Sequence, residues 1–316
     1  MEHQEHRHIS VLLEESVAGL NIRPGGIYID GTTGGGGHSA AIAERLEGGR
    51  LICVDKDDYA LKQAAQRLLP WQERITFMQD DFCNLARILG RLGIASIDGL
   101  LLDLGVSSFQ LDDAERGFSY MKEGPLDMRM DQRAGPTAAE LINTYEERQL
   151  ADLIFRYGEE RHARRIAAAI VQRREQAPIE TTTELADLIR AAMPAAARRE
   201  AQHPAKRTFQ ALRIEVNNEL GIIEQTLRDA AARMNEGGRI AVITFHSLED
   251  RIVKETFAAL AQGCTCPRDF PVCVCGKKPQ LRIVTRKPLT PSAQELEHNH
   301  RSRSAKLRIA ERLIED

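Results

Sequence analysis

The sequence is poor in the features that mark disulfide-rich, membrane-spanning and strongly basic proteins. Six cysteines in 316 residues are too few for a disulfide scaffold, and no apolar run approaches the ~20 residues of a membrane-spanning helix. The N-terminal residues 1–6 are charged and lack the apolar core of a signal peptide. We therefore expect a cytoplasmic protein without a membrane partner. Because the net charge is only −3, any surface that binds nucleic acid must be locally basic.

The most informative segment covers residues 30–39 and contains four consecutive glycines. An apolar run, 27–29, precedes it and helix-forming residues, 40–46, follow it, which predicts a strand, a glycine-rich turn and a helix. Such glycines let a ligand approach the main chain closely. The segment lacks the Gly-Lys-Ser/Thr ending of a phosphate-binding loop. Instead, Asp30 stands directly before the glycines, where a carboxylate repels phosphate and favours a cation such as the ammonium of a methionine-type amino acid.

Two further aspartates also end apolar, strand-like runs. Asp55 follows residues 51–54 and Asp103 follows residues 99–102. Ligands of open α/β sheets bind outside the carboxyl ends of the strands, so the three aspartates are expected to face one crevice. An acidic residue after the second strand typically accepts ribose hydroxyl groups. Together these positions favour S-adenosylmethionine (SAM) over a nicotinamide dinucleotide as the cofactor.

Residues 112–207 differ in character from the sequence around them. They contain charged loop segments followed by helical patterns, which predicts an inserted helical substrate-recognition domain within a SAM-binding domain formed by 1–111 and 208–316. A helix carrying apolar residues at spacings of three and four from 209 to 227 is expected to return the chain to the sheet. The strand near 239–245 is expected to lead into a helix capped by Ser247, with His246 at the ligand edge. Two last strands, near 281–285 and 305–310, would complete a seven-stranded sheet.

Basic residues gather in the insertion and in the C-terminal stretch, and they are candidates for phosphate contacts. The alternative interpretation is a solvated helix face. The candidates are Arg161, Arg164, Arg165, Lys206, Arg207, Arg301 and Arg303.

Four cysteines form two closely spaced Cys-x-Cys pairs: Cys264, Cys266, Cys273 and Cys275. Four thiols within twelve residues are able to bind zinc tetrahedrally, in a structural role. The pairs are tighter than the usual Cys-x-x-Cys spacing, and a disulfide is disfavoured in a reducing cytosol.

Taken together, these motifs resemble the bacterial 16S ribosomal RNA cytosine-N4 methyltransferase family known as RsmH or MraW. The matching segments span almost the whole chain: residues 8–15, 30–39, 103–112, 116–119, 125–131, 157–170, 203–220, 245–254 and 301–308. The resemblance implies a class I SAM-dependent methyltransferase fold, a Rossmann-like seven-stranded sheet with an inserted helical domain. It also implies N4-methylation of one cytidine in the decoding region of 16S rRNA in the small ribosomal subunit.

The resemblance implies a set of cofactor contacts in addition to Asp30: Gly36, Gly37, His38, Asp55, Phe82, Asp103 and Gln110. Phe82 has an equally good interpretation as a core aromatic residue. Asp103 is our first candidate for the group that accepts an N–H of the cytosine amine, with Ser107 and Ser108 as alternates. Its other interpretation is a role in cofactor binding alone.

Three other functions remain open at this stage: a nicotinamide-dependent oxidoreductase, a non-catalytic RNA-binding assembly factor, and a methyltransferase that acts on a small molecule or a protein. The sequence also leaves open whether the protein is a monomer or a homodimer. The assembly state of the ribosomal substrate is equally undetermined.

Overall fold

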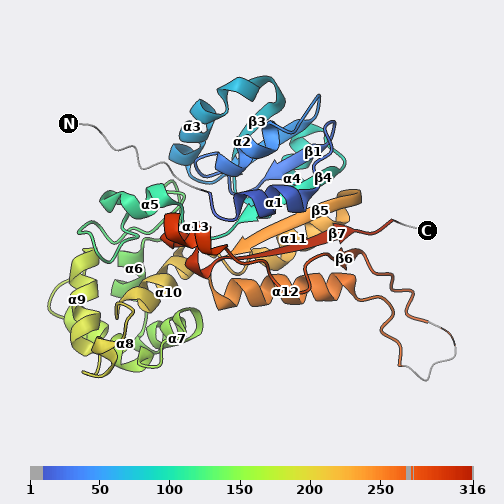
Figure 1. Ribbon diagram of the computed structural model, residues 1–316. Helices are drawn as coiled ribbons and strands as arrows, with labels where there is room; N and C mark the ends of the chain where they lie inside the picture. The colour runs from blue at the N-terminus through green and yellow to red at the C-terminus, as the bar shows by residue number, and fades with distance from the viewer. Residues whose placement is uncertain (1–9, 268–271, 273, 315–316) are drawn as a thin grey trace. The chain divides into compact units, whose positions relative to one another are not determined.

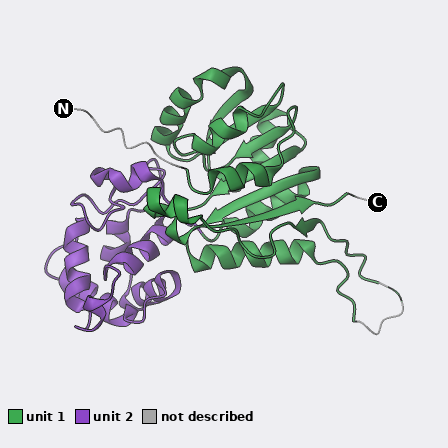
Figure 2. Ribbon diagram, in the orientation of Figure 1, with its two compact units in different colours: residues 1–105, 220–316 green, residues 106–219 purple. Residues whose placement is uncertain are grey.

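The structure is a computed structural model that describes residues 10–267, 272 and 274–314. The chain divides into two compact units, one formed by residues 1–105 and 220–316 and the other by residues 106–219 (Figure 2). The predicted insertion, 112–207, lies inside the second unit, and its role in substrate recognition stays a prediction. Among the helices within the described ranges, none is long and apolar enough to cross a membrane.

The first unit is built around a seven-stranded sheet with the order β3-β2-β1-β4-β5-β7-β6 (Figure 1). Its strands are β1 (Ile27–Asp30), β2 (Arg50–Asp55), β3 (Ile75–Gln79), β4 (Ile97–Asp103), β5 (Met234–Thr244), β6 (Leu281–Ile283) and β7 (Lys306–Arg312). β7 pairs antiparallel with β5 and β6, and the other neighbouring pairs are parallel. This Rossmann-like sheet confirms the predicted class I methyltransferase fold.

The central strands are buried on both faces, as nearly continuous apolar runs require. In β4, Leu100 and Leu102 belong to one core cluster, whereas Leu101 belongs to the cluster on the other face. The helices that flank the sheet are α1 (Leu13–Leu20), α2 (Gly37–Ala43), α3 (Asp58–Arg67), α4 (Leu85–Leu92), α11 (Ile223–Ala232) and α12 (Ser247–Ala261). Residues of α1, α2 and α3 enter one cluster, and residues of α4, α11 and α12 enter the other. Two cores therefore fix the sheet and the register of its strand ends.

The second unit is helical and has one apolar core of its own. Its α-helices are α5 (Ser108–Asp112), α6 (Ala138–Thr144), α7 (Glu147–Gly158), α8 (Ala163–Arg174), α9 (Thr182–Ala192) and α10 (Lys206–Asn217). The prediction of a single helix over 209–227 is wrong. α10 ends because Asn218 adopts a left-handed conformation with φ 48°, which asparagine tolerates better than most residues. The apolar spacing resumes only in α11.

Candidate active site

The glycine-rich loop joins β1 to α2 and bonds to the carboxyl ends of the two strands that flank β1 in the sheet, β2 and β4. The Gly31 N–H donates to the Leu101 carbonyl of β4, and the Thr33 N–H donates to the Val54 carbonyl of β2. Gly36 has φ 76°, and a Cβ there would lie 3.1 Å from the Ala64 Cα of α3. These contacts require glycine at position 36 for packing within the protein.

Gly37 and Gly34 differ in what surrounds them. A Cβ at Gly37 would lie 1.9 Å from the Ser10 hydroxyl oxygen, so a larger residue here would have to displace that side chain. A Cβ at Gly34 would have only the Thr32 carbonyl within 4 Å, at 3.9 Å. Gly34 is therefore a position in the loop where the main chain borders open space.

Asp30 and Asp55 end β1 and β2 and are held by short hydrogen bonds. Asp30 is 1% exposed, and its Oδ2 and Oδ1 accept from the Ser39 hydroxyl at 2.6 Å and from the Thr32 N–H at 3.2 Å. The Asp55 carboxylate accepts from the N–H groups of Gly34 at 2.8 Å and Asp57 at 2.9 Å. Burial raises the pKa of each aspartate to about 6, although these hydrogen bonds lower it.

Asp103 ends β4 and is tied to the glycine-rich loop, because its N–H donates to the Thr32 hydroxyl at 2.6 Å. Its side chain is 25% exposed, and its Oδ2 lies 3.9 Å from the His38 Nδ1. Its Oδ1 is buried and has no hydrogen-bond partner among the described residues. Burial raises the pKa of Asp103 well above its ordinary value, and the charges of Asp30 and Glu249 raise it further. Asp103 is thus a carboxyl group with an unused acceptor.

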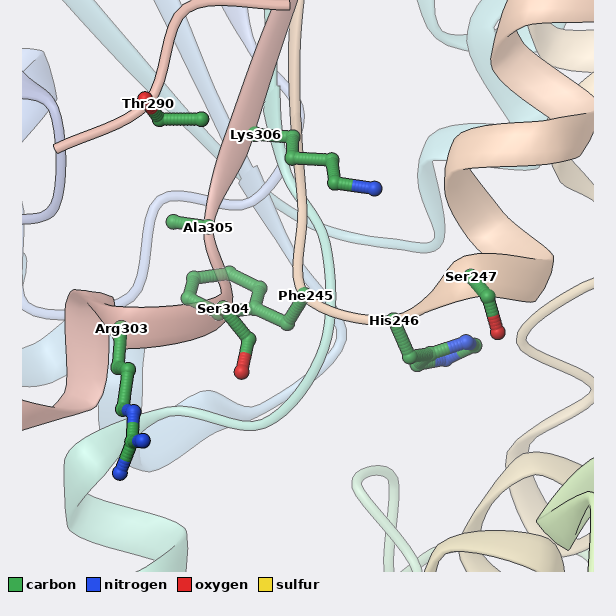
Figure 3. A pocket seen from close by; sticks show the side chains of 8 residues that line it. All are labelled: Phe245, His246, Ser247, Thr290, Arg303, Ser304, Ala305 and Lys306. Atoms are coloured by element: carbon green, nitrogen blue, oxygen red, sulfur yellow. The ribbon is translucent and has the colours of Figure 1, made fainter.

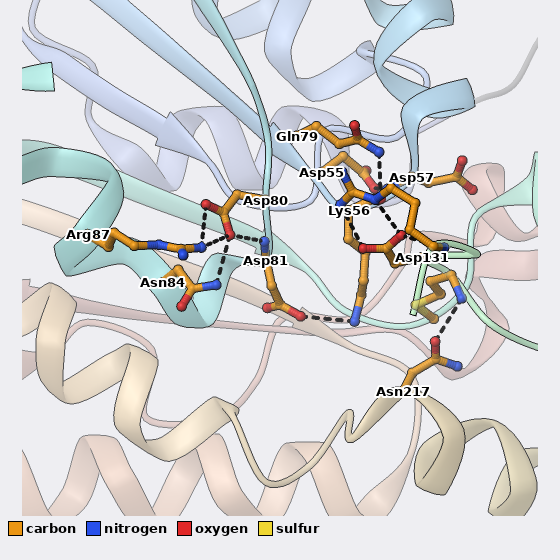
Figure 4. A network of polar contacts seen from close by, with 12 residues as sticks. Asp55, Lys56, Asp57, Gln79, Asp80, Asp81, Asn84, Arg87, Asp131 and Asn217 are labelled. Carbon is orange, nitrogen blue, oxygen red and sulfur yellow. Dashed lines mark hydrogen bonds and ion pairs between the residues drawn. The ribbon is translucent and has the colours of Figure 1, made fainter. Parts of the chain in front are cut away.

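The three aspartates lie close enough to act on one another, because the charge of Asp55 raises the pKa of Asp30 and the charge of Asp30 raises the pKa of Asp103. We call Asp30, Asp55 and Asp103 the acidic crevice below. None of them forms an ion pair with a lysine or arginine within the described part of the chain. Lys56, the nearest cation in sequence, lies 3.1 Å from the Asp81 carboxylate instead (Figure 4). Buried carboxylates without a cation are costly, so the crevice is suited to a positively charged ligand.

The acidic crevice fits S-adenosylmethionine better than a nicotinamide dinucleotide. The cofactor carries an ammonium and a sulfonium, either of which would offset the buried negative charge. A pyrophosphate would instead face three carboxylates. The Gly34 N–H already donates to Asp55, so this loop N–H is not available to a phosphate. The residues present therefore argue against the oxidoreductase alternative.

Phe82 and Gln110 lie in different units. Phe82 begins the short helix η2 (Phe82–Asn84), where it packs against the core cluster that contains α4 and α11. A Cβ on Gly31 would lie 3.1 Å from the Phe82 Cβ, so Phe82 borders the glycine-rich loop as well as the core. Both interpretations of Phe82 agree with this position. Gln110 belongs to the second unit, and its predicted cofactor contact stays a prediction.

Ser107 and Ser108 also belong to the second unit. Ser107 and Gln110 form a reciprocal capping box at the start of α5, with the Gln110 N–H donating to the Ser107 hydroxyl at 3.2 Å. The Ser107 N–H donates to the Gln110 side chain at 3.0 Å. These contacts give Ser107 and Gln110 a structural role at the start of α5. The alternate catalytic roles of Ser107 and Ser108 stay predictions.

Known proteins place the chain in a family. The sequence matches the MraW methylase family over residues 5–313. The chain belongs to this family. "Ribosomal RNA small subunit methyltransferase H" of Brevibacillus brevis is 54% identical over 307 residues, covering 97% of this chain and 98% of that protein. The protein of the same name from a Paenibacillus species is 57% identical over 314 residues, covering 97% and 99%.

The predicted family resemblance is therefore confirmed. Among solved structures, a putative rRNA-methylase from Clostridium thermocellum aligns with a TM-score of 0.46 at 12% identity, covering 96% of this chain and 99% of that one. That likeness is too distant to carry an argument about function.

The turn between β5 and α12 brings the charge of Glu249 close to Asp103, whereas the sequence patterns placed only His246 of this turn at the ligand edge. The predicted N-cap, Ser247, is wrong: His246 is the N-cap, and it forms a capping box with Glu249. Glu249 is 1% exposed and accepts from the Phe245 N–H at 2.8 Å. Its buried charge contributes to the raised pKa of Asp103. The spacing of a capping box, S/T-x-x-E, would have revealed the pair if histidine were counted as a capping residue.

Three of the four predicted zinc ligands come together. Cys264, Cys266 and Cys275 place their sulfur atoms within 4.8 Å of one another, and the Cys264 and Cys275 sulfurs are 3.7 Å apart. Cys273 lies outside the described residues.

The predicted RNA-binding residues of the second unit fall into two groups. Arg161 and Arg207 lie 3.5 Å from Glu200 and 3.7 Å from Glu160, respectively, in ion pairs. The other three are exposed and form no ion pair among the described residues: Arg164, Arg165 and Lys206. Arg301 and Arg303 are exposed on a short helix of the first unit, η5 (His300–Ser304).

Proposed function

We propose that this protein transfers a methyl group from S-adenosylmethionine to the N4 amine of a cytidine in the decoding region of 16S ribosomal RNA. The observation that carries the proposal is the acidic crevice, with its buried unused acceptor on Asp103, in a chain of the MraW methylase family. The curated relatives, whose whole length the chain nearly matches, are named for methylation of small-subunit ribosomal RNA. The site residues and the choice of cytidine are part of the proposal.

The crevice residues would bind the cofactor by charge and hydrogen bonding. When bound, S-adenosylmethionine supplies an electrophilic methyl group on its sulfonium. Asp30 offers a buried negative charge to the ammonium, and Asp55 offers an acceptor to a ribose hydroxyl. His38, at 3.9 Å from Asp103, and Phe82 would border this site. A cation beside Asp103 would lower the pKa of that carboxyl and keep it ionised.

Asp103 would orient the nucleophile. The N4 amine of cytosine is a weak nucleophile because its lone pair is delocalised into the ring. The Asp103 carboxyl group, whose side chain is 25% exposed and whose buried Oδ1 has no hydrogen-bond partner among the described residues, would accept an N–H of that amine, which favours a localised lone pair and fixes the direction of attack. After transfer, the amine carries an additional positive charge, and the same carboxylate is placed to take its proton.

The target base must leave its stack before it reaches this crevice. Single-stranded or splayed RNA presents such a base, and proteins hold it through contacts to flanking phosphates. The candidates for such phosphate contacts stay the basic residues predicted from the sequence, Arg161, Arg164, Arg165, Lys206, Arg207, Arg301 and Arg303, of which all but the half-buried Arg207 are exposed.

Methyl transfer in vitro tests the proposed function. The enzyme is incubated with labelled S-adenosylmethionine and small subunits, or naked 16S RNA, from cells that lack the enzyme, and the product nucleosides are separated by mass. We expect the label in N4-methylcytidine. Label in another nucleoside would overturn the choice of base, and its absence despite tight cofactor binding would favour the non-catalytic RNA-binding alternative.

We also propose that the cysteine cluster binds a structural zinc ion. Three thiols within 4.8 Å match the sulfur ligands of structural zinc sites. Elemental analysis of the purified protein should give about one zinc per chain, and Cys264→Ser should lose it. Cys83→Ser, a change outside the cluster, should keep it. A metal-free wild-type protein prepared in zinc-containing medium would exclude the site.

A further inference from the structure

A hollow of about 300 Å³ lies where β5 ends and β7 begins (Figure 3). It is formed entirely within the first unit. Its lining comes from the β5–α12 turn, from the short helix η5 and the residues after it, and from one loop residue: Phe245, His246, Ser247, Arg303, Ser304, Ala305, Lys306 and Thr290. None of the lining residues is acidic.

The charges and donors of the hollow suit an anion. Arg303 is exposed and has no ion-pair partner within the described ranges. The Lys306 ammonium lies 3.3 Å from an Asp250 carboxylate oxygen. Both oxygens of that carboxylate already accept from Arg308, at 2.6 and 3.1 Å, so Asp250 offsets the lysine charge only in part. The hydroxyl of Ser304 adds a neutral donor, whereas the partial positive charge at the N-terminus of α12 is already offset by Glu249 and Asp250 in its first turn.

The segment that carries Arg303 is held in place before any ligand arrives. The Ser302 hydroxyl is buried and donates to the Asn299 carbonyl at 2.7 Å, which closes the turn of η5. The Ala305 N–H donates to the Ser302 carbonyl at 2.8 Å. On the other side of the hollow, buried Glu249 fixes the Phe245 backbone. Because these residues are already held in place, binding a ligand here would cost little conformational entropy.

The strand register places this hollow near the acidic crevice. Asp103 of β4 is paired with Ile243 of β5, and the next residue of β5, Thr244, is paired with Lys306 of β7. Two interstrand spacings therefore separate the backbones of Asp103 and Lys306, which is about 10 Å. That distance is comparable to the reach of one nucleotide.

We infer that this hollow binds a phosphate group of the RNA substrate next to the target cytidine, with Arg303 and Lys306 as its cationic contacts. The inference rests on the proposed function for the identity of the ligand. A phosphate held there would position the flanking backbone while the base enters the crevice at Asp103. The carboxylate of the cofactor has the same charge, so the experiment must distinguish these two sources of an anion.

The test compares Arg303→Ala with Arg286→Ala, which removes an exposed arginine outside the hollow. Fluorescence anisotropy with a labelled single-stranded RNA that carries the unmethylated decoding-region sequence gives the affinity between 50 and 200 mM KCl. We expect Arg303→Ala to weaken RNA binding by about tenfold and to reduce the slope of log affinity against log salt by about 0.7. Arg286→Ala should leave the slope unchanged, and Arg303→Lys should restore it.

A second titration measures S-adenosylmethionine binding by calorimetry, and Arg303→Ala should change that affinity by less than about twofold. A tenfold loss of cofactor affinity would mean that the hollow takes the cofactor carboxylate. Equal losses of RNA affinity for the two alanine variants would mean that no specific phosphate site exists. If the wild-type protein binds RNA through Arg303 but yields no N4-methylcytidine, the proposed function fails and the phosphate site stands.

Discussion

Asp30→Asn is expected to make the ligand-free protein more stable and the cofactor complex weaker. The side chain is 1% exposed, and burial raises its pKa from 3.8 to about 6. A shift of this size destabilises the folded protein by about 3 kcal/mol at pH 8. The amide of asparagine keeps an acceptor for the Thr32 N–H and carries no charge. We expect a net gain of about 1–3 kcal/mol, since the new amide fits the Ser39 hydroxyl less well than the carboxylate does.

The pH dependence gives the sign of this effect. The folded state holds the Asp30 proton up to a pKa of about 6, whereas the unfolded state loses it near 3.9. The Asp30 carboxyl group therefore makes the wild-type protein lose stability as the pH rises from about 4 to about 7, and the variant lacks this one contribution while keeping those of Asp55 and Asp103. The advantage of the variant should grow by about 1 kcal/mol between pH 5 and pH 8. Urea unfolding at these two pH values measures it.

Asp98→Asn is the matched control, because Asp98 lies near the other end of β4 and accepts from the Ile27 N–H at 2.8 Å. The Asp98→Asn variant should be less stable than the wild type and should bind S-adenosylmethionine with the same affinity. Asp30→Asn should weaken S-adenosylmethionine binding by about tenfold or more, which is the loss of affinity expected when one hydrogen bond to a charged group is removed. If Asp30→Asn proved less stable than the wild type at pH 8, or bound the cofactor equally well, the acidic crevice would not be a cation site.

Three further predictions concern the same site. Asp103→Asn should reduce turnover by about 100-fold in the methyl-transfer assay, and near-normal turnover with unchanged cofactor affinity would exclude both proposed roles of Asp103. Gly36→Ala should cost about 2 kcal/mol in urea unfolding, because its φ of 76° and the Ala64 Cα at 3.1 Å oppose a Cβ; an unchanged midpoint would contradict this packing. Cofactor affinity measured by calorimetry should fall as the pH drops below about 6, where Asp30 and Asp55 take up protons. An affinity independent of pH between 5 and 8 would show that neither carboxylate binds the cofactor.

The ends of three strands could be predicted from the sequence because a strand buried on both faces is a nearly continuous apolar run, and an aspartate ends each of these runs. Asp30, Asp55 and Asp103 each follow an apolar run, and in the structure each ends a strand of the sheet. The sequence pattern did not predict the hydrogen bonds between polar side chains at these strand ends. The hydrogen bond from Ser39 to Asp30 depends on how α2 packs, and the spacing of residues does not determine that.

Two features of the structure could not be predicted from the spacing of residues along the sequence: the end of α10 and the hollow where β5 ends and β7 begins. The apolar spacing across 209–227 continues through Asn218, so periodicity alone predicted one helix, whereas the left-handed conformation at that residue ends α10. The hollow beside Arg303 and Lys306 arises from the antiparallel pairing of β7 with β5. Thr244 and Lys306, which are 62 positions apart in the sequence, pair beside it, and only the sheet order brings these two segments together.

Small-subunit RNA from cells provides the most direct test of the central claim. A strain that lacks the gene is complemented with the wild type or with Asp103→Asn, and the fragment that contains the decoding region is excised and analysed by mass spectrometry. We predict N4-methylcytidine at one position with the wild type and its loss with both the deletion and Asp103→Asn. An unchanged fragment in the deletion strain would contradict the proposed substrate, and full methylation with Asp103→Asn would contradict the role of the acidic crevice.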